Sequence, residues 1–357
     1  GFSPYNAHQM AAMLTEAARG ATQSELLTLT QMPDESVERL RWITETRKLI
    51  PGSAADKSLV IETANSLWAS PSHPFAPDFT CLVQAHFFAQ TFDLVSINPV
   101  QAAAQVNRWI RQRTRDRISS VVGPDSFDDS GAGLVLVNTI YLRSHWASQF
   151  EAGKTKMRHF QIPKGHQIPH LMMQQSGEFG YAEEADWQCL DLPLEALGYS
   201  LRILLPRREG LRSDIESGLT SRVWRDLGGR MKREPVHVSL PRFAFTTELD
   251  LAPLWATFGA KRLFSRDHAD LSGLSSDWPY HVTKVLHTTT IEVNETGATA
   301  SAVTAVPAAP FADATPTAQP LPKYRVFNAD HPFLWFIVHQ PSHLILFAGR
   351  FAGKSDD

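Results

Sequence analysis

Apolar residues recur along this chain with two different spacings. In the first third they return every three or four residues, which is the spacing of one face of an α-helix. Two shorter stretches, near residues 211–228 and 249–263, have the same period. The spacing predicts helices over 5–18, 23–31, 35–48, 78–89 and 99–120.

In the rest of the chain apolar and polar residues alternate, and β-branched and aromatic residues are frequent, as is typical of strands. Helices therefore come first, and strands follow from well-separated parts of the chain. This order predicts an α+β protein. The expected strands are 134–143, 179–183, 187–193, 199–205, 235–245, 281–294, 323–328, 333–339 and 343–350.

Composition and charge exclude several classes of protein. The 357 residues are 43% hydrophobic and 20% charged, which is ordinary for a globular protein with a sizeable core. The net charge of −3 argues against a nucleic-acid-binding protein. No apolar run reaches the roughly 18 residues of a membrane span. The N-terminus lacks a signal-peptide pattern, so we expect an intracellular, mature or trimmed chain.

Few residues indicate redox or metal chemistry. We interpret Cys81 and Cys189 as small buried hydrophobes, with a single disulfide as the alternative. The 14 histidines are scattered, and the close pair His166 and His170 lies in a polar stretch, so we expect no functional metal site. The signatures of hydrolases, metalloproteases, P-loops and dinucleotide-binding folds are absent.

The segment NRWIRQRTRDR places Arg108, Arg111 and Arg115 at helical spacing. A patch that binds nucleic acid or glycosaminoglycan is one interpretation. We favour a solvated basic face over an apolar stripe, given the acidic net charge of the chain.

The region 281–322 has an unusual composition. A predicted strand, HVTKVLHTTTIEV, is followed by NETG, in which Gly297 can adopt a positive φ. Next comes ATASAVTAV, where a β-period places Ala298, Ala300, Ala302 and Thr304 on one face. Side chains this small would let a strand slip between two strands of a packed sheet. A flexible linker is the alternative. The segment VPAAPFADATPTAQPLP that follows is rich in proline.

At these residues the chain resembles the serpins. LVNTIYLRSHWASQF (136–150), SLPRFAFTTELDL (239–251), FSRDHADLSGLS (264–275), VLHTTTIEVNETGATASA (285–302) and ADHPFLWFIVHQPSHLILFAGRF (329–351) match family motifs in the expected order. The N-terminal FSPYNAHQMAAMLTEAARGAT is similar to the family helix that contacts the opening sheet. The resemblance covers nearly the whole chain.

The resemblance implies a fold and a function. Serpins are suicide inhibitors, mostly of serine proteases, with three β-sheets, a large central sheet, about eight or nine helices and an exposed reactive loop. The cleaved loop inserts into the central sheet and carries the acylated protease with it. We therefore expect one serpin domain over 1–357, a loop at about 295–322, no enzymatic activity and no cofactor. The resemblance further implies that the usual first helix is not present in this sequence, which suggests a prokaryotic origin, and heparin binding is not expected.

The resemblance also implies a partner, a serine protease, and a monomeric inhibitor. An extracellular or secreted location is favoured from the family, with a cytoplasmic one as the alternative. Counting from Gly297 puts the scissile bond at Phe311–Ala312, and Ala308, Ala309 and Pro310 would contact the protease. Pro-Phe suits an apolar primary pocket, chymotrypsin-like or subtilisin-like. Counting back from the HPF motif gives Leu321–Pro322 instead, which is a poor site because proline follows. Pro307 would remove one hydrogen bond from an inserted strand.

Three further sets of residues carry over from the family. The hinge is Glu295, Gly297, Ala298, Thr299, Ala300, Ser301 and Ala302. The breach, where the loop first inserts, is Trp146, Arg242 and Glu295. The shutter, which closes the central sheet, is Ser3, Asn6, Asn138 and His287. Asn294 begins an N-glycosylation sequon that we interpret as fortuitous, because a glycan there would hinder insertion.

Two classes of function follow. The first is an inhibitory serpin. The second is a serpin-fold protein without inhibitory action, such as a storage, carrier or chaperone-like member. The small face formed by Ala298, Ala300, Ala302 and Thr304 favours inhibition, since bulky or charged residues there are common in non-inhibitory relatives. An interdomain linker is disfavoured because fewer than 40 residues follow the proline-rich segment.

Overall fold

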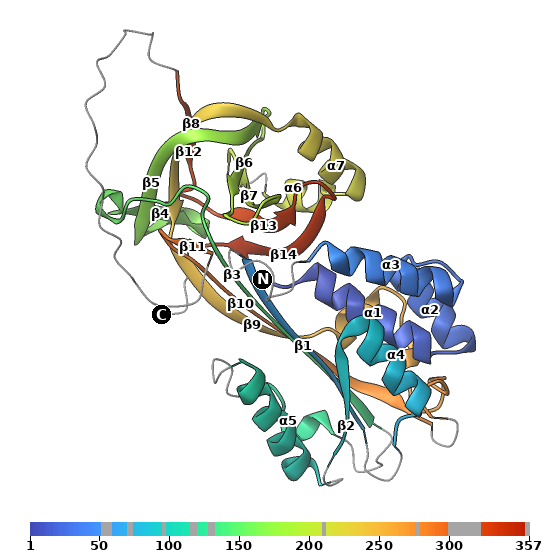
Figure 1. Ribbon diagram of the computed structural model, residues 1–357. Helices are drawn as coiled ribbons and strands as arrows, with labels where there is room; N and C mark the ends of the chain where they lie inside the picture. Colours follow the sequence, from blue (N-terminus) through green and yellow to red (C-terminus); the bar gives the residue numbers. More distant parts are fainter. Residues whose placement is uncertain are drawn as a thin grey trace. The chain divides into compact units, whose positions relative to one another are not determined.

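The computed structural model describes residues 1–50, 59–69, 74–94, 98–114, 120–127, 133–208, 212–275, 279–298 and 323–353 (Figure 1). The chain divides into two compact units. Unit 1 comprises Gly1–Tyr141, Thr246–Thr290 and Ile345–Phe347. Unit 2 comprises Leu142–Phe245, Ile291–Leu344 and Ala348–Asp357.

Helices and strands are both abundant in the described residues. The helices are α1 (Pro4–Ala17), α2 (Gly20–Thr30), α3 (Ser36–Lys48), α4 (Pro77–Phe87), α5 (Pro99–Thr114), α6 (Arg212–Gly218), α7 (Ser221–Arg230) and α8 (Ala252–Thr257). The strands are β1 (Leu59–Ala69), β2 (Ala89–Asp93), β3 (Gly133–His145), β4 (Lys156–Ile162), β5 (His166–Glu183), β6 (Trp187–Pro193), β7 (Tyr199–Pro206), β8 (Lys232–Pro241), β9 (Phe243–Asp250), β10 (His281–Val293), β11 (Gly297–Ala298), β12 (Arg325–Asn328), β13 (Phe333–His339) and β14 (Leu344–Phe351). Within these residues, no helix combines the length and the apolar character that a membrane crossing requires.

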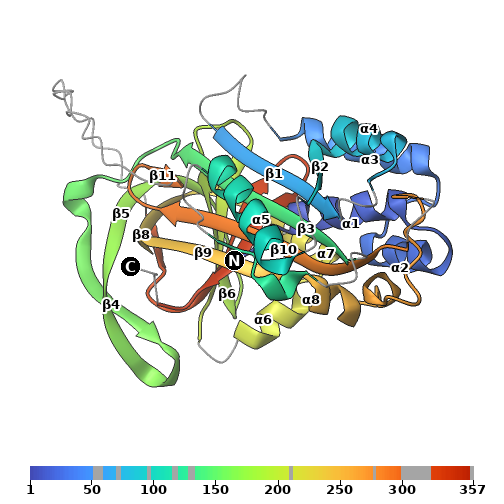
Figure 2. The same ribbon diagram turned by 90° about the horizontal axis from the view of Figure 1, so that it is seen from below.

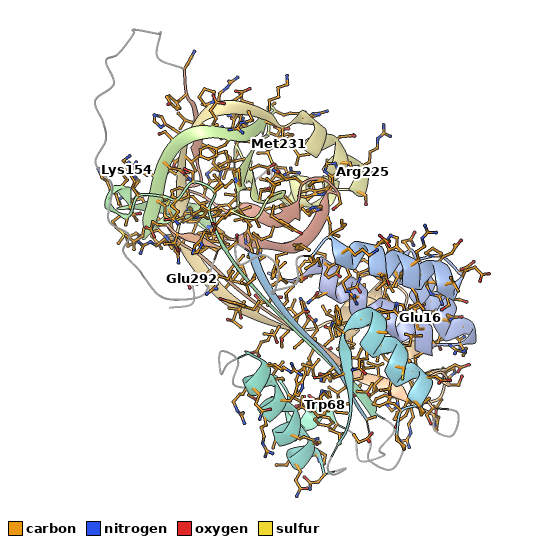
Figure 3. The ribbon with its side chains drawn as sticks, viewed as in Figure 1. Glu16, Trp68, Lys154, Arg225, Met231 and Glu292 are labelled. Atoms are coloured by element: carbon orange, nitrogen blue, oxygen red, sulfur yellow. The ribbon has the colours of Figure 1, made fainter. Side chains whose placement is uncertain are left out.

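Unit 1 is built around strands that are buried on both faces. Along β3, Leu134 and Leu136 pack into a cluster with residues of α1, α2 and α4. The alternate residues Val135 and Val137 pack against α5 and Trp68 instead. Side chains alternate between the faces of a strand, so helices that cover both faces of this sheet explain why LVLV is continuously apolar. Trp68 is labelled in Figure 3, and Figure 2 shows α5 in a view from below.

The pairing of β3 with β10 is parallel in unit 1. Nine residue pairs join Gly133–Tyr141 to His281–Thr290, with one irregularity between Val282 and Lys284. β1 pairs in parallel with β2. The described strands of this sheet follow the order β2-β1-β3-β11-β10-β9, and β3 and β10 therefore form its centre.

In unit 2, β5 organises the second strand network. This strand has 18 residues, and it pairs antiparallel with β4, β6 and β8 along different parts of its length. The described order is β12-β8-β5-β6-β7-β13-β14, with β4 added on β5. Phe243, Phe333, Trp335 and Phe351 form an aromatic cluster beneath it.

The α+β class and the large central sheet are confirmed. The other two expected sheets share β5 and form one hydrogen-bonded network. The predicted strand 235–245 is wrong as a single element, because Pro241 ends β8 and β9 begins at Phe243. The predicted helix 78–89 ends at Phe87, and Phe88 adopts a left-handed conformation. α5 is described to Thr114, residues 115–119 of the predicted helix 99–120, including Arg115, lie outside the described residues, and Ser120 is not helical.

Some side-chain and strand predictions are corrected too. Cys189 is buried, as expected, but Cys81 is exposed, and both thiols are free. The reason is that α4 buries Phe79, Val83 and Phe87, which leaves Cys81 on the opposite face of the helix.

Strands β1, β2 and β4 were not predicted, because polar residues interrupt the alternation of apolar and polar positions along them. On α5, Arg108 is exposed opposite the buried Val106 and Ile110, in agreement with a solvated basic face.

Candidate functional site

The first residues of the predicted reactive loop occupy a place in the central sheet. Gly297 and Ala298 form β11, which pairs antiparallel with His145 and Ser144 of β3. On its other side, Ala298 pairs with Val293 of β10. Ala298 is completely buried. The loop was expected to lie outside the sheet from its first residues, so this expectation is wrong for Gly297 and Ala298.

Glycine is required at position 297 by a close approach to β3. A Cβ atom built on Gly297 would lie 2.0 Å from the carbonyl oxygen of Ser144 and 2.6 Å from the Cα of His145. Both atoms belong to the backbone, so a side chain could be accommodated only by moving one strand away from the other. The predicted use of Gly297 for a positive φ is not needed, because its strand conformation and the close packing already explain the residue.

The turn before β11 is held by Asn294. Its side-chain Oδ1 accepts hydrogen bonds from the backbone N–H of Thr296 (3.0 Å), from the Thr296 hydroxyl (2.7 Å) and from the N–H of Gly297 (3.3 Å). Its Nδ2 donates to Glu292 at 2.9 Å. This nitrogen is the atom to which a glycan would be attached. Here it makes a hydrogen bond within the turn that precedes β11.

The three breach residues lie together in unit 2. Arg242 Nε donates to Glu295 Oε1 at 2.7 Å, and the hydroxyl of Thr155 donates to the same oxygen. Trp146 donates its backbone N–H to Thr296 O at 3.0 Å and its indole N–H to Asn294 O at 2.7 Å. The side chain of Glu295 is only 9% exposed, whereas that of Arg242 is 41% exposed.

Glu295 is ionised despite its burial. Removal from water raises the pKa of its carboxyl, but the hydrogen bonds from Arg242 and Thr155 outweigh this effect, so the pKa lies below its ordinary value. A buried carboxylate needs such partners, because an isolated charge in the interior is strongly disfavoured. The charged carboxylate therefore attaches the start of the loop to Arg242, which lies between β8 and β9, and to Thr155, which precedes β4.

The four shutter residues lie together in unit 1, and all are buried. Asn138 on β3 and His287 on β10 are direct cross-strand partners, and His287 Nδ1 lies 2.6 Å from Asn138 Oδ1. From α1, Asn6 Nδ2 donates to the same oxygen at 3.2 Å. Ser3 caps the helix by accepting from the N–H of Asn6 at 3.2 Å, and its hydroxyl donates to Leu346 O at 2.6 Å.

The contacts of His287 define its protonation state. The backbone N–H of Ser3 lies 2.9 Å from Nε2, and a backbone N–H can only donate, so Nε2 must be an unprotonated acceptor. Nδ1 then carries the hydrogen and donates to Asn138. Burial lowers the pKa of His287 to about 4, which agrees with a neutral ring.

Several predicted site residues cannot be placed. Pairing beyond Ala298 would involve residues outside the described part of the chain. These are the hinge residues Thr299, Ala300, Ser301 and Ala302, the protease-contacting residues Ala308, Ala309 and Pro310, and the reactive bond Phe311–Ala312.

The structure adds residues that sequence reasoning missed. Asn65 on β1 accepts a hydrogen bond from Asn138 Nδ2, and Thr289 lies 3.0 Å from His287 Nε2. Thr155 and Asn294 complete the breach. Polar residues within predicted or apolar strands, such as Asn65 in LVIETANSLWA, are the signal that could have identified the first two.

Comparisons with known proteins agree over the whole chain. A family model described as Serpin (serine protease inhibitor) matches residues 1–353. A serpin-like protein of the prokaryote Thermococcus kodakarensis is 31% identical, over 99% of this chain and 80% of its own. The leukocyte elastase inhibitor of Xenopus tropicalis is 31% identical, over 98% of this chain and 92% of its own. The crystal structure of the thermophilic serpin Tengpin in its native state superposes with a TM-score of 0.83 at 24% identity, covering 99% of this chain and 88% of that one.

Proposed function

Because the chain belongs to the serpin family, we propose that it is an inhibitory serpin, which traps a serine protease of chymotrypsin-like or subtilisin-like specificity after cleavage at Phe311–Ala312. The observation that carries the proposal is the pairing of β11 with both β3 and β10. It provides a strand position between two existing strands and a starting register for the rest of the loop.

That register leads to the proposed bond. Ala298 pairs with Ser144, so each following loop residue would pair with the preceding residue of β3. Continued in this way, the inserted strand reaches Gly133, the first residue of β3, at Ala309. Phe311 comes two residues later, at the end of the strand. Leu321 would lie far beyond it, so the register favours Phe311–Ala312 over Leu321–Pro322.

The same register explains the small side chains of the loop. Directly opposed residues of antiparallel strands point to the same face. Ala300, Ala302 and Thr304 would thus share the face of β3 that carries Asn138 and Leu136, which packs on the α1 cluster. Large side chains on that face would overpack it, at a cost of about 1–3 kcal/mol each. Only Pro307, on the other face, would leave one backbone hydrogen bond unmade.

Insertion in this register would separate β3 from β10. The parallel pair Asn138–His287 would have to part, and Thr304 would arrive opposite Asn138. We assign the shutter residues the role of holding the two strands together until cleavage. They are not a hydrolytic centre, because His287 directs its Nδ1–H to Asn138 and its Nε2 accepts from a backbone N–H.

The driving force would be the added strand. A loop that cannot pair fully while it is tethered at both ends can do so after cleavage, and the interior gains backbone hydrogen bonds and buried side chains. Proline before phenylalanine restricts the uncleaved segment to an extended form, which lowers the entropy lost on docking to a protease.

Incubation with chymotrypsin tests the proposal. We expect an adduct that survives denaturing electrophoresis, and mass spectrometry should find a released peptide that begins at Ala312. Phe311→Arg should abolish the adduct with chymotrypsin and produce one with trypsin, because the primary pocket selects the residue before the bond. Cleavage without any adduct would favour the non-inhibitory alternative, and an unchanged reaction of Phe311→Arg would refute the assigned bond.

A further inference from the structure

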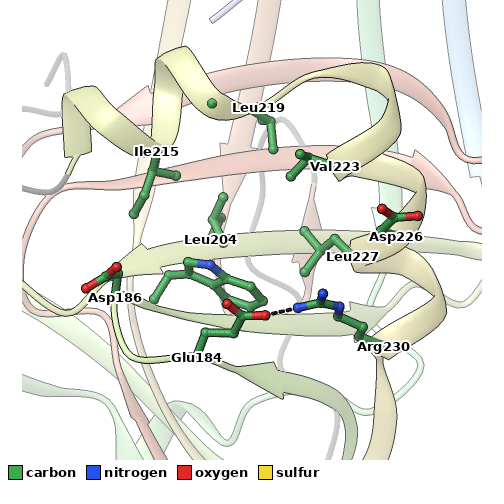
Figure 4. A pocket seen from close by; sticks show the side chains of 11 residues that line it. Glu184, Asp186, Leu204, Ile215, Leu219, Val223, Asp226, Leu227 and Arg230 are labelled. Atoms are coloured by element: carbon green, nitrogen blue, oxygen red, sulfur yellow. Dashed lines mark ion pairs between the residues drawn. The ribbon is translucent and has the colours of Figure 1, made fainter.

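A cavity of about 420 Å³ lies in unit 2, under the helix pair α6 and α7. Figure 4 shows the side chains that line it. Its volume falls within the range of pockets that hold small organic molecules, about 300–1,000 Å³. Among the described residues, no member of the hinge, breach or shutter lines this pocket.

The inner wall of the pocket is apolar. Leu204 and Leu227 are almost fully buried, and Ile215 and Leu219 are half-buried. The indole of Trp187, at the first position of β6, contributes an aromatic surface. Such a wall binds a ligand mainly through the apolar area that the ligand removes from water.

The rim of the pocket is acidic. Glu184, Asp186 and Asp226 line it, and Arg230 is the one cationic side chain among the described lining residues. Figure 4 shows the ion pair between Glu184 and Arg230, which neutralises that cation. Asp226 has only a 4.0 Å contact with the exposed Arg222, which is worth little in water.

Asp186 is the carboxylate that this network leaves available. Among the interactions of the described residues it uses only its backbone, whose carbonyl accepts from the N–H of Arg207 at 2.8 Å. The turn between β5 and β6 is closed by a hydrogen bond from Glu184 N–H to Trp187 O at 2.9 Å. Asp186 therefore stands next to Trp187 on a short, hydrogen-bonded turn.

We propose that this pocket binds a small organic cation with an apolar ring, the ring against the Leu204 and Leu227 wall and the ammonium between Trp187 and Asp186. An indole is the side chain that attracts a cation best, and a carboxylate beside it adds charge complementarity. The same rim would repel an anion of equal shape. The pocket is thus a ligand site that needs no movement of the reactive loop.

Three ligands with the same ring test the site by calorimetry on the intact chain. Tryptamine carries an ammonium, tryptophol a hydroxyl and indole-3-propionate a carboxylate on chains of similar length. We expect tryptamine to bind about tenfold more tightly than tryptophol, an amount that one cation–π and charge contact can supply. Indole-3-propionate should bind most weakly, and tryptamine should lose affinity as salt rises.

Variants locate the site. Asp186→Asn should reduce tryptamine affinity severalfold, toward that of tryptophol, because only the cation–π contact with Trp187 then favours the ammonium, whereas Glu178→Gln, at an exposed position outside the pocket, should leave it unchanged. Val223→Trp places a bulky group in the half-exposed pocket wall and should block all three ligands, with circular dichroism to verify folding. The proposal would be overturned if the three ligands bind equally or if tryptamine fails to bind at millimolar concentration. Wild-type affinity for tryptamine in both Asp186→Asn and Val223→Trp would also overturn it.

Discussion

The shutter and the breach differ in which residues lie beside β3. At the shutter, β3 pairs directly with β10, and buried polar side chains from α1, β1, β3 and β10 join across the pair. Beside the breach, the hinge residues Gly297 and Ala298, which lack large side chains, lie against β3, and the buried carboxylate of Glu295 anchors this segment. The contact between β3 and β10 at the shutter depends on buried hydrogen-bond partners. The contact between β3 and β11 beside the breach depends on the small size of Gly297 and Ala298.

The two regions also differ in charge. His287 at the shutter is neutral, because burial lowers its pKa to about 4. Glu295 at the breach is charged, because its hydrogen-bond partners outweigh the effect of burial on its pKa. We therefore expect the shutter to be sensitive to protonation and the hinge residues beside the breach to be sensitive to side-chain volume. Each expectation can be tested separately.

The largest expected effect comes from a charge introduced at the hinge residue Ala298, beside the breach. Ala298→Arg would place a guanidinium at a completely buried position, which is strongly unfavourable without a partner. We expect the loop to stay outside the sheet, so that chymotrypsin cleaves the variant and the yield of denaturant-stable adduct falls at least about tenfold. Ala152→Arg, at an exposed alanine in the same unit, is the matched control. Trapping by Ala298→Arg at the level of wild type would contradict loop insertion.

Acidification should weaken the shutter next. The pKa of His287 is about 4 when folded and near 6.5 when unfolded. Between pH 6.5 and about pH 4, His287 is therefore protonated in the unfolded chain but neutral in the folded chain. The free energy of unfolding falls over this range by about 3 kcal/mol in total. Urea unfolding between pH 7 and pH 4 measures the loss.

Two variants isolate the contribution of this histidine from that of the carboxylates. His287→Gln should be less stable at pH 7 but should lose about 3 kcal/mol less than wild type over the same pH range. His166→Gln, at an exposed position, should retain the wild-type dependence. If all three proteins have the same pH profile, His287 does not control the acid sensitivity.

A smaller effect should follow from one methyl group added at the hinge residue Gly297. Gly297→Ala introduces a Cβ within 2.0 Å of the Ser144 carbonyl oxygen, and relief requires β11 to move, at a cost of about 2 kcal/mol. The midpoint of urea unfolding should shift to a lower urea concentration accordingly. Gly153→Ala is the control, because a Cβ at Gly153 meets no other atom within 4 Å. Equal shifts in the two variants would show that β11 has no specific need for glycine.

Much of the site could be predicted from the sequence, for reasons that differ between residues. The helical spacing at the N-terminus predicted α1, whereas Ser3 and Asn6 were predicted as shutter residues from the family resemblance. Arg242 and Glu295 were paired from family motifs, and the structure brings them within hydrogen-bond distance. Asn65 and Thr155 were missed, because a polar residue in a strand or a loop has no periodic signature that distinguishes a buried partner from an exposed one.

Strand lengths and exposure were harder to predict. The stretch 166–171 belongs to β5, but neither face of that part is buried, so it lacks the alternation that marks a half-buried strand. Cys81 was assigned to the core because cysteine is often buried, yet α4 turns it outward. In both cases the neighbours, and not the segment itself, decide which face meets water.

By itself the sequence determined the α+β class, the family and the small face of the hinge, because these depend on local spacing and on motifs that lie in one stretch of chain. Only the tertiary structure decided that Gly297 and Ala298 already pair within the sheet and that His287 must be neutral. Both facts depend on atoms that are distant in sequence: the Ser144 carbonyl that leaves no room at position 297, and the Ser3 N–H that needs an acceptor.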